Sequence, residues 1–227
     1  MTTDFFNKKR LSVTAKTAAV VFIFCALFYA WFLNQAERYP YRKSFYFLVD
    51  TSTHLEACVA GATLQGGAGY IVSDDEREYS ALSVYLTESE GRNAQNGFSE
   101  EQTYSLLEKQ VDGLYFKTRE EKCKKTRILS AFQCLDDCIE VLDNEIKRLE
   151  ESATQQSSKR ILNELRNQFV YLNNAYETDF PSYARVCEKA NKALQAVVDG
   201  IVYAKDLRYV CCQLCDSFVK LSEEYAL

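Results

Sequence analysis

Two pairs of cysteines in the C-terminal half have a spacing at which their thiols could bind a metal ion. Cys211 and Cys215 lie four residues apart in the motif CCQLC, and Cys134 and Cys138 repeat that spacing. Residues four apart share one face of a helix, so each pair could offer two thiolates to zinc, and both pairs together could complete a tetrahedral site. The alternative, which we favour, is that these thiols are small core residues of a reduced bundle or form one or two disulfides. We therefore expect no metal and no other cofactor.

A glycine cluster at residues 64–73, LQGGAGYIVS, is the second candidate for chemistry. Gly61 and Gly66 have the spacing of a phosphate-binding GxxxxG loop, but Gly67 stands where such a loop needs a lysine. The glycines also follow a helical pattern and precede a strand pattern, which is the wrong direction for a helix N-terminus to hold an anion. The pattern predicts a turn that ends a helix and starts a strand.

Catalytic motifs are missing from the sequence. The only histidine, His54, stands beside an expected helix start, and neither GxSxG nor HExxH occurs. The Asp and Glu side chains are scattered over helix faces, an arrangement typical of solvation rather than of paired acid–base work. We expect a binding protein and not an enzyme.

Composition and charge narrow the class of partner. The 227 residues, 47% of them hydrophobic, are enough for one large or two small cores. The net charge is -5 and the chain has no run of five basic residues, whereas a nucleic-acid surface needs clustered Lys and Arg. We expect no nucleic-acid partner.

The most apolar stretch is residues 18–33, AAVVFIFCALFYAWFL, which would span roughly 24 Å as a helix at about 1.5 Å per residue. We expect an uncleaved signal anchor with a cytoplasmic tail at 1–16, a transmembrane helix at 17–34 and a juxtamembrane linker at 35–43; a cleaved signal peptide is the alternative. The balance of basic residues on the two sides favours a cytoplasmic N-terminus and an extracytoplasmic remainder. The expected location is the cell membrane, with the lipid bilayer as one partner.

Residues 44–118 mix strand-like and helix-like periods. Four segments have strand patterns: 45–50, 70–73, 79–87 and 113–117. Helical patterns begin near His54 and at Glu88, and the second can run as far as Gln110. The order is therefore β-α-β-β-α-β, which predicts a small ferredoxin-like α+β domain with an antiparallel sheet.

Residues 119–227 carry apolar side chains at helical spacing. The first helical stretch has an unbroken seam: Ile128, Phe132, Leu135, Ile139, Leu142, Ile146 and Leu149. Similar seams continue beyond it, with Pro181 marking a helix start and Gly200 either bending or separating the last two stretches. Short connections make neighbouring helices antiparallel, so we predict a three- or four-helix bundle. The whole fold class is then α+β with an N-terminal transmembrane helix.

Within residues 44–118, several features are similar to the SPOR domain, the peptidoglycan-binding module of bacterial division and sporulation proteins. They are the strand order, the first strand YFLVDTST with Ala57 in the helix after it, the entry GGAGYI to the second strand, and YSALSVYL as the third strand. Where the family has Gln and Gly in strand one and Gly-Pro-Phe at the end of strand three, this chain has Val49 and the stretch VYL at 84–86. The resemblance implies the fold of that family and a glycan ligand.

In the SPOR family the glycan, stripped of its stem peptides, lies on the open face of the sheet. Carried onto this chain, that face would show five residues: Tyr46, Tyr79, Ser83, Tyr85 and Tyr115. Aromatic faces and hydroxyls suit sugar rings, although tyrosine is also an ordinary strand residue. These side chains are the predicted glycan-binding site.

The sequence leaves two functions open. The first is a membrane-anchored bacterial envelope protein whose exported SPOR-like domain binds peptidoglycan in cell division or sporulation. The second is a non-catalytic assembly protein of the envelope that has lost glycan binding and acts through its helical bundle, with itself or another envelope protein as partner. Unbroken heptad seams permit the second function, and they equally build an intramolecular core.

Overall fold

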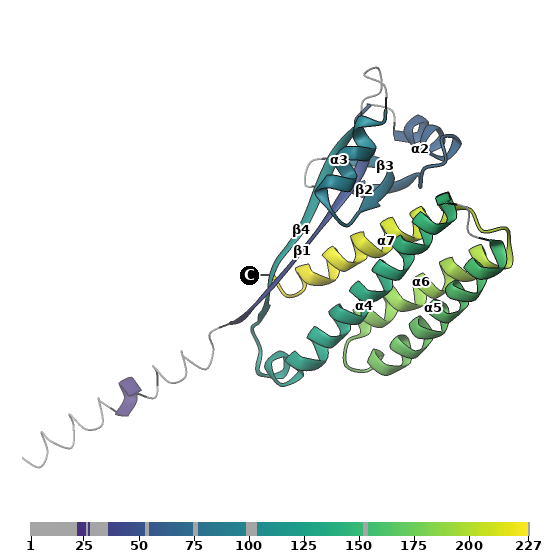
Figure 1. The fold of residues 1–227 in the computed structure, drawn as a ribbon. Coiled ribbons are helices and arrows are strands. Elements are labelled where there is room, and N and C mark those ends of the chain that lie inside the picture. Colours follow the sequence, from purple (N-terminus) through teal and green to yellow (C-terminus); the bar gives the residue numbers. More distant parts are fainter. Residues whose placement is uncertain are drawn as a thin grey trace, which may run out of the picture.

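The described residues form an α+β fold in which a four-stranded antiparallel sheet lies beside a bundle of long helices (Figure 1). This computed structural model describes residues 22–25, 27, 36–52, 55–74, 77–98, 104–151 and 154–226. The strands are β1 (Glu37–Asp50), β2 (Tyr70–Ser73), β3 (Glu78–Tyr85) and β4 (Tyr104–Phe116). The helices are α2 (Leu55–Leu64), α3 (Glu88–Asn96), α4 (Arg119–Glu151), α5 (Gln155–Tyr176), α6 (Pro181–Asp199) and α7 (Ala204–Glu223).

The sheet has the strand order β2-β3-β1-β4, and every neighbouring pair is antiparallel. Because β1 and β2 both run antiparallel to β3 between them, they are parallel to each other, which is the split βαβ arrangement. The predicted β-α-β-β-α-β order is confirmed.

β1 and β4 are longer than the sequence patterns predicted, and together they form a long two-stranded ribbon. Tyr104 pairs with Asp50 at one end, and Phe116 pairs with Glu37 at the other. The linker expected at 35–43 is therefore largely strand, and the helix expected to reach Gln110 ends before β4 begins. Pairing between strands far apart in the sequence, which no local period reveals, explains these differences.

The glycine cluster ends α2 and starts β2, as predicted. The N–H of Gly67 donates to the carbonyl of Ala62 at 2.8 Å, and the N–H of Ala68 donates to the carbonyl of Leu82 in β3 at 2.7 Å. Gly69 has φ of 63°, a left-handed conformation that glycine adopts without strain. The cluster therefore turns the chain from helix into sheet.

The bundle consists of α4, α5, α6 and α7, so the four-helix form of the prediction is the one found in the described chain. The predicted seam of α4 is buried from Ile128 to Ile146, and Leu149 is partly buried. Pro181 is the first residue of α6, as predicted. Gly200 follows the end of α6, and α7 begins at Ala204, so this glycine separates two helices instead of bending one.

The transmembrane helix expected at 17–34 is not supported. Among the residues that the structure describes, none of the helices combines the length and the apolar character needed to cross a bilayer. Of the expected span, only residues 22–25 and 27 are described; the other positions, and the expected tail at 1–16, lie outside the described residues. The fold class is thus corrected to α+β without this helix.

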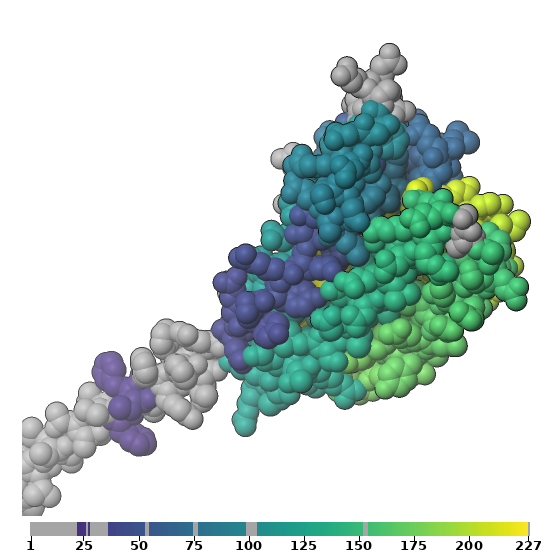
Figure 2. All heavy atoms as spheres, viewed as in Figure 1, coloured from purple at the N-terminus to yellow at the C-terminus, as the bar shows by residue number. Residues whose placement is uncertain are grey.

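The sheet and the bundle share one hydrophobic core. Side chains of β1, β2, β3 and β4 belong to the same buried cluster as side chains of α4, α5, α6 and α7. The bundle helices lie directly against the sheet layer in the space-filling view (Figure 2). The two segments expected as neighbours along the chain therefore pack as one body.

Candidate functional site

One face of the sheet packs against α7. The ring of Phe45 in β1 contacts the ring of Phe218 in α7, with centroids 5.4 Å apart, and Phe218 contacts Phe132 of α4 at 5.2 Å. All three side chains are completely buried. Where α7 crosses it, this face is protein interior and not an open platform for a ligand.

The opposite face of the sheet is covered by α2 and α3. Leu48 of β1 and Leu82 of β3 are buried together with Ala62 of α2. A Cβ added to Gly91 of α3 would lie only 3.0 Å from the side chain of Leu106 in β4, so this helix approaches the sheet closely. Both faces are therefore covered at the centre of the sheet.

Three of the five residues predicted to bind glycan lie together on the face towards α2 and α3. Tyr46 of β1 pairs with Tyr85 of β3, and Ser83 pairs with Leu48 on the same face. Ser83 is buried, and the two tyrosines are half-buried. This group is packed beside the helices, so little of it is open to a polymer.

Tyr79 lies on the other face. The register of β1 and β3 slips between Leu48 and Val49, which leaves Leu82 as an extra residue in β3. Because of this bulge, the alternation of faces along β3 shifts, and Tyr79 packs against the core that includes the bundle. The strict alternation assumed from the sequence is wrong at this point.

Tyr115 lies towards the far end of the ribbon. It pairs with Arg38 of β1, eight positions before Tyr46, which is roughly 26 Å along a strand at about 3.3 Å per residue. The N–H of Tyr115 donates to the carbonyl of Tyr225, just after α7, at 2.7 Å. The predicted glycan face is thus divided among three places.

A polar groove of about 430 Å³ lies between the sheet and α7. Its lining comes from the end of β2, from β4 and from the C-terminal half of α7: Ser73, Asp74, Leu107, Glu108, Lys109, Gln110, Val219, Lys220 and Glu223. Hydroxyl, amide, carboxylate and ammonium groups side by side can form hydrogen bonds with a polyhydroxyl ligand such as a sugar. We call this recess the polar groove.

A buried carboxylate next to this groove engages both of its lysines. Asp216 of α7 is 1% exposed, and it accepts hydrogen bonds from Lys109 at 2.8 Å and from Lys220 at 2.7 Å. It also accepts one from the hydroxyl of Tyr70 at 2.9 Å. Burial acts to raise the pKa of Asp216, but the hydrogen bonds from the two lysines outweigh it, and the pKa lies below its ordinary 3.8. Burial, and then the Asp216 charge, raise the pKa of Tyr70, which keeps its hydroxyl a donor.

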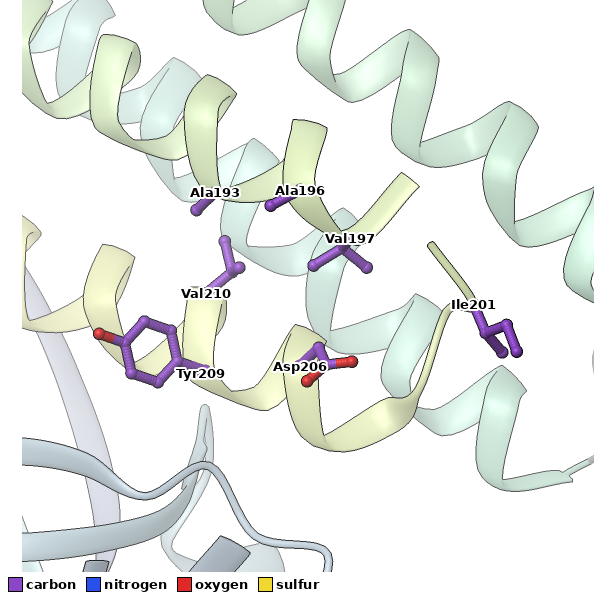
Figure 3. A pocket seen from close by; sticks show the side chains of 7 residues that line it. All are labelled: Ala193, Ala196, Val197, Ile201, Asp206, Tyr209 and Val210. Carbon is purple, nitrogen blue, oxygen red and sulfur yellow. The ribbon is translucent and has the colours of Figure 1, made fainter. Parts of the chain in front are cut away.

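A second, apolar recess of about 380 Å³ lies between the end of α6 and the start of α7 (Figure 3). Seven residues line it: Ala193, Ala196, Val197, Ile201, Asp206, Tyr209 and Val210. The ring of Tyr209 meets the ring of Tyr70 in β2 edge-on, with centroids 5.5 Å apart, so the sheet supports this wall. We call this recess the α6–α7 groove.

The two cysteine pairs are not brought together. Cys134 and Cys138 of α4 lie near Cys187 of α6, whereas Cys215 of α7 lies near Asp143 of α4. Asp143 is five residues beyond Cys138, about 7.5 Å further along the helix axis at a rise of 1.5 Å per residue. In the part of the chain that the structure describes, no three His, Cys, Asp or Glu side chains are arranged to hold a metal ion.

The buried thiols are neutral core groups. Burial raises the pKa of Cys138 and of Cys187 to about 12, and it raises the pKa of Cys212 and Cys215 well above the ordinary 9.0. Every cysteine in the described ranges is a free thiol. Because the thiolate is the form that attacks electrophiles and binds metals, these side chains act as small apolar residues.

Comparison with known proteins finds no match to this chain among protein-family models, curated proteins or solved structures. The resemblance to the SPOR domain is thereby neither supported nor refuted. His54, the only histidine, lies outside the described residues.

Neither the Asp216 cluster nor the α6–α7 groove was found from the sequence. The one local signal for the cluster is the four-residue spacing of Asp216 and Lys220 on α7. Lys109 and Tyr70 join it from strands more than a hundred residues earlier in the chain. Only the packing of α7 on the sheet brings these groups together.

Proposed function

We propose that this protein is a non-catalytic assembly protein that acts through surfaces of its helical bundle. The observation that carries the proposal is the packing of α7 on the sheet through Phe45 and Phe218. A sheet face that is buried in a shared core cannot serve as an open platform for a glycan strand, so the sheet acts as a support for the bundle. Under this proposal a partner contacts the surfaces of the helices.

The bundle exposes large apolar side chains that fit such a role. Tyr171 of α5 is 70% exposed, and Ile201 and Tyr203, between α6 and α7, are 61% and 51% exposed. Ile201 also lines the apolar α6–α7 groove, and exposed apolar side chains of this kind are typical of contact sites between proteins. Under this proposal the partner is a protein, either another copy of this chain or another protein of the cell envelope.

The buried charges support a structural role over a catalytic one. Lys109 is only 14% exposed at its side chain and is bound to Asp216, which Lys220 and Tyr70 also engage. A general base or nucleophile needs an accessible site towards its substrate, which a carboxylate that is 1% exposed and bound to three donors lacks. This cluster therefore joins the sheet to the bundle.

Photo-crosslinking in cells that produce the protein tests the proposal. A photoreactive phenylalanine analogue is placed at one position at a time, at Tyr171 or Ile201 to sample the bundle and at Tyr46 or Gln110 to sample the sheet. We expect discrete protein–protein crosslinks from bundle positions alone. Protein crosslinks confined to the sheet positions, or none from any position, would contradict an assembly role.

Peptidoglycan binding is a second candidate, favoured specifically by the polar groove. Its carboxylates, amide and hydroxyl are the groups that form hydrogen bonds with sugars, and it lies beside the sheet. This candidate also requires that the chain lie outside the cytoplasm. The ligand would contact the exposed side chains of Glu108 and Gln110 rather than the five residues expected from the sequence.

Co-sedimentation of the full chain with purified peptidoglycan, stripped of stem peptides, decides between the two candidates. The assembly proposal expects the folded chain to stay in solution. Glycan binding expects retention that falls about tenfold or more in the double variant Glu108→Ala, Gln110→Ala, because hydrogen bonds to a sugar in a groove are lost. The variant Tyr171→Ala, on the far helix α5, is the matched control for either result.

A further inference from the structure

We infer that the α6–α7 groove is the docking site for a short apolar segment of a partner protein, and that this segment carries a lysine or an arginine. The inference rests on the assembly role proposed above, and it names the surface and the chemistry of the partner. Its grounds are the shape of the groove, the number of residues that line it, and its charge (Figure 3).

The shape of the groove is set by small side chains on rigid elements. Ala193 of α6 and Val210 of α7 point toward each other across the gap, and the small side chain of Ala196 keeps it open (Figure 3). Tyr209 closes one side, and its ring is held by the contact with Tyr70. An apolar side chain of a partner can enter this recess without a rearrangement of either helix.

The size of the groove fits a short segment of a partner better than a second folded copy of this chain. Seven residues line it, whereas a stable interface between folded proteins takes about 20–30 residues from each partner. Its volume of about 380 Å³ is near the lower end of the range of about 300–1,000 Å³ for ligand sites. A few inserted side chains therefore fill the groove.

The groove carries a negative charge, which favours a segment that contains a basic residue. Asp206 is the one charged residue in its lining, and its carboxylate makes no hydrogen bond or ion pair with any residue that the structure describes. Asp206 lies in the first turn of α7, where the helix dipole favours a negative charge. The last turn of α6 has no basic side chain, so the negative end of its dipole has no cation from its own helix. A lysine or arginine beside the inserted apolar side chain would supply that cation.

Selection from a library of short random peptides displayed on phage, against the immobilised full chain, tests this inference. We expect the selected peptides to combine apolar side chains with a lysine or arginine. A synthetic peptide of the selected sequence is then titrated against variants of the chain. Ala196→Trp fills the groove at an exposed helix position and is expected to weaken binding about tenfold or more.

Lys189→Trp is the matched control for that variant. Position 189 is exposed on α6, two turns before Ala196, and does not line the groove. The same bulky side chain there is expected to leave the affinity for the peptide unchanged. Circular dichroism of both variants tests whether each is folded.

Charge variants test the second half of the inference. Asp206→Asn is expected to weaken binding about two- to fivefold, the range of one partly exposed ion pair. Asp206→Lys is expected to prefer a form of the peptide in which glutamate replaces the basic residue. If wild type and Asp206→Lys prefer the same form of the peptide, the assignment of a basic partner is overturned.

The outcomes that overturn the inference differ from those that overturn the assembly role. Equal binding of the peptide to wild type and to Ala196→Trp, or selection of peptides without the apolar and basic pattern, overturns the docking site alone. A concentration-dependent mass in sedimentation that Ala196→Trp abolishes would identify a second copy as the occupant, which also overturns it. Crosslinks from Tyr171 without any from Ile201 would keep the assembly role and reject this groove.

Discussion

The hydroxyl of Tyr70 in β2 donates a hydrogen bond to Asp216 of α7 at 2.9 Å. Lys109 of β4 reaches the same carboxylate at 2.8 Å, so one side chain of the last helix joins both edge strands of the sheet. Since this carboxylate is buried, the sheet and the bundle depend on each other for stability.

The substitution Asp216→Asn is expected to lower the free energy of unfolding by about 3 kcal/mol, because it leaves the largely buried Lys109 without its counter-charge. Tyr70→Phe removes a single hydrogen bond to this charged group and is expected to cost about 1.5 kcal/mol. Urea unfolding followed by circular dichroism measures both values. Equal, small effects of the two substitutions would mean that the lysines do not depend on this carboxylate.

Acid is expected to weaken the wild-type protein through the same group. Burial opposes the charged form, but Lys109 and Lys220 hold the folded pKa of Asp216 below its ordinary 3.8. A depressed pKa contributes stability that is complete above the unfolded value and is lost as the pH falls through the folded value. The difference in stability between wild type and Asp216→Asn should therefore shrink below about pH 4. Urea midpoints across this range measure it, and a constant difference would count against the ion pairs.

Phe218→Ala is expected to destabilise the protein by about 3–5 kcal/mol, because it opens a cavity between α7, α4 and β1. Amide hydrogen exchange should show loss of protection in the sheet and in the bundle together, since both belong to one core. Tyr171→Ala, at a position that is 70% exposed, should change stability by about 0.5 kcal/mol or less. A bundle that loses protection while the sheet keeps it would show two independent units.

A glycine of the helix-to-strand turn, Gly69, and a glycine inside α2, Gly61, are expected to respond in opposite ways to alanine. Gly69 has φ of 63°, and a Cβ there would lie 2.6 Å from the hydroxyl oxygen of Thr63, so Gly69→Ala should cost about 1–2 kcal/mol or more. Gly61 lies inside α2 with no atom within 4 Å of an added Cβ, so Gly61→Ala should stabilise by about 0.5–1 kcal/mol. Thermal unfolding of the two variants gives the sign directly, and the same sign for both would contradict the turn geometry.

Exposed and buried cysteines are expected to react differently with an alkylating reagent. Cys123 is exposed, whereas Cys138, Cys187 and Cys215 are buried, and burial raises the pKa of each buried thiol far above neutral pH. Iodoacetamide at neutral pH should therefore alkylate Cys123 in the folded protein and the buried thiols only after unfolding, because the thiolate is the reactive form. Peptide mass spectrometry identifies the modified positions. Fast labelling of Cys187 in the native state would show that the α4–α6 contact opens.

Local patterns were sufficient to predict much of the secondary structure. The period of the seam from Ile128 to Ile146 identified α4 and its buried face, and Pro181 identified the start of α6. The direction of the glycine cluster identified the turn into β2. Each of these features depends on residues within a few positions of one another, so a sequence displays it directly.

Contacts between distant segments could not be predicted in the same way. The bulge that sends Tyr79 to the other face arises where β1 and β3 slip in register, and it left the predicted glycan residues on different faces. The length of β4 depends on its pairing with β1, so the helical period that extended to Gln110 was misleading. Register and pairing are properties of two strands together, which one strand's pattern does not contain.

The amino-acid order alone determined which helices and strands form and which stripe of each helix is apolar, because periodicity and turn residues act over a few positions. The fold alone decided that the apolar stripe of α7 would meet the sheet, that Lys109 and Tyr70 would converge on Asp216, and that α6 and α7 would leave a groove between them. An apolar stripe specifies that it must be buried but not against what, and that choice is made by packing among elements far apart in the chain.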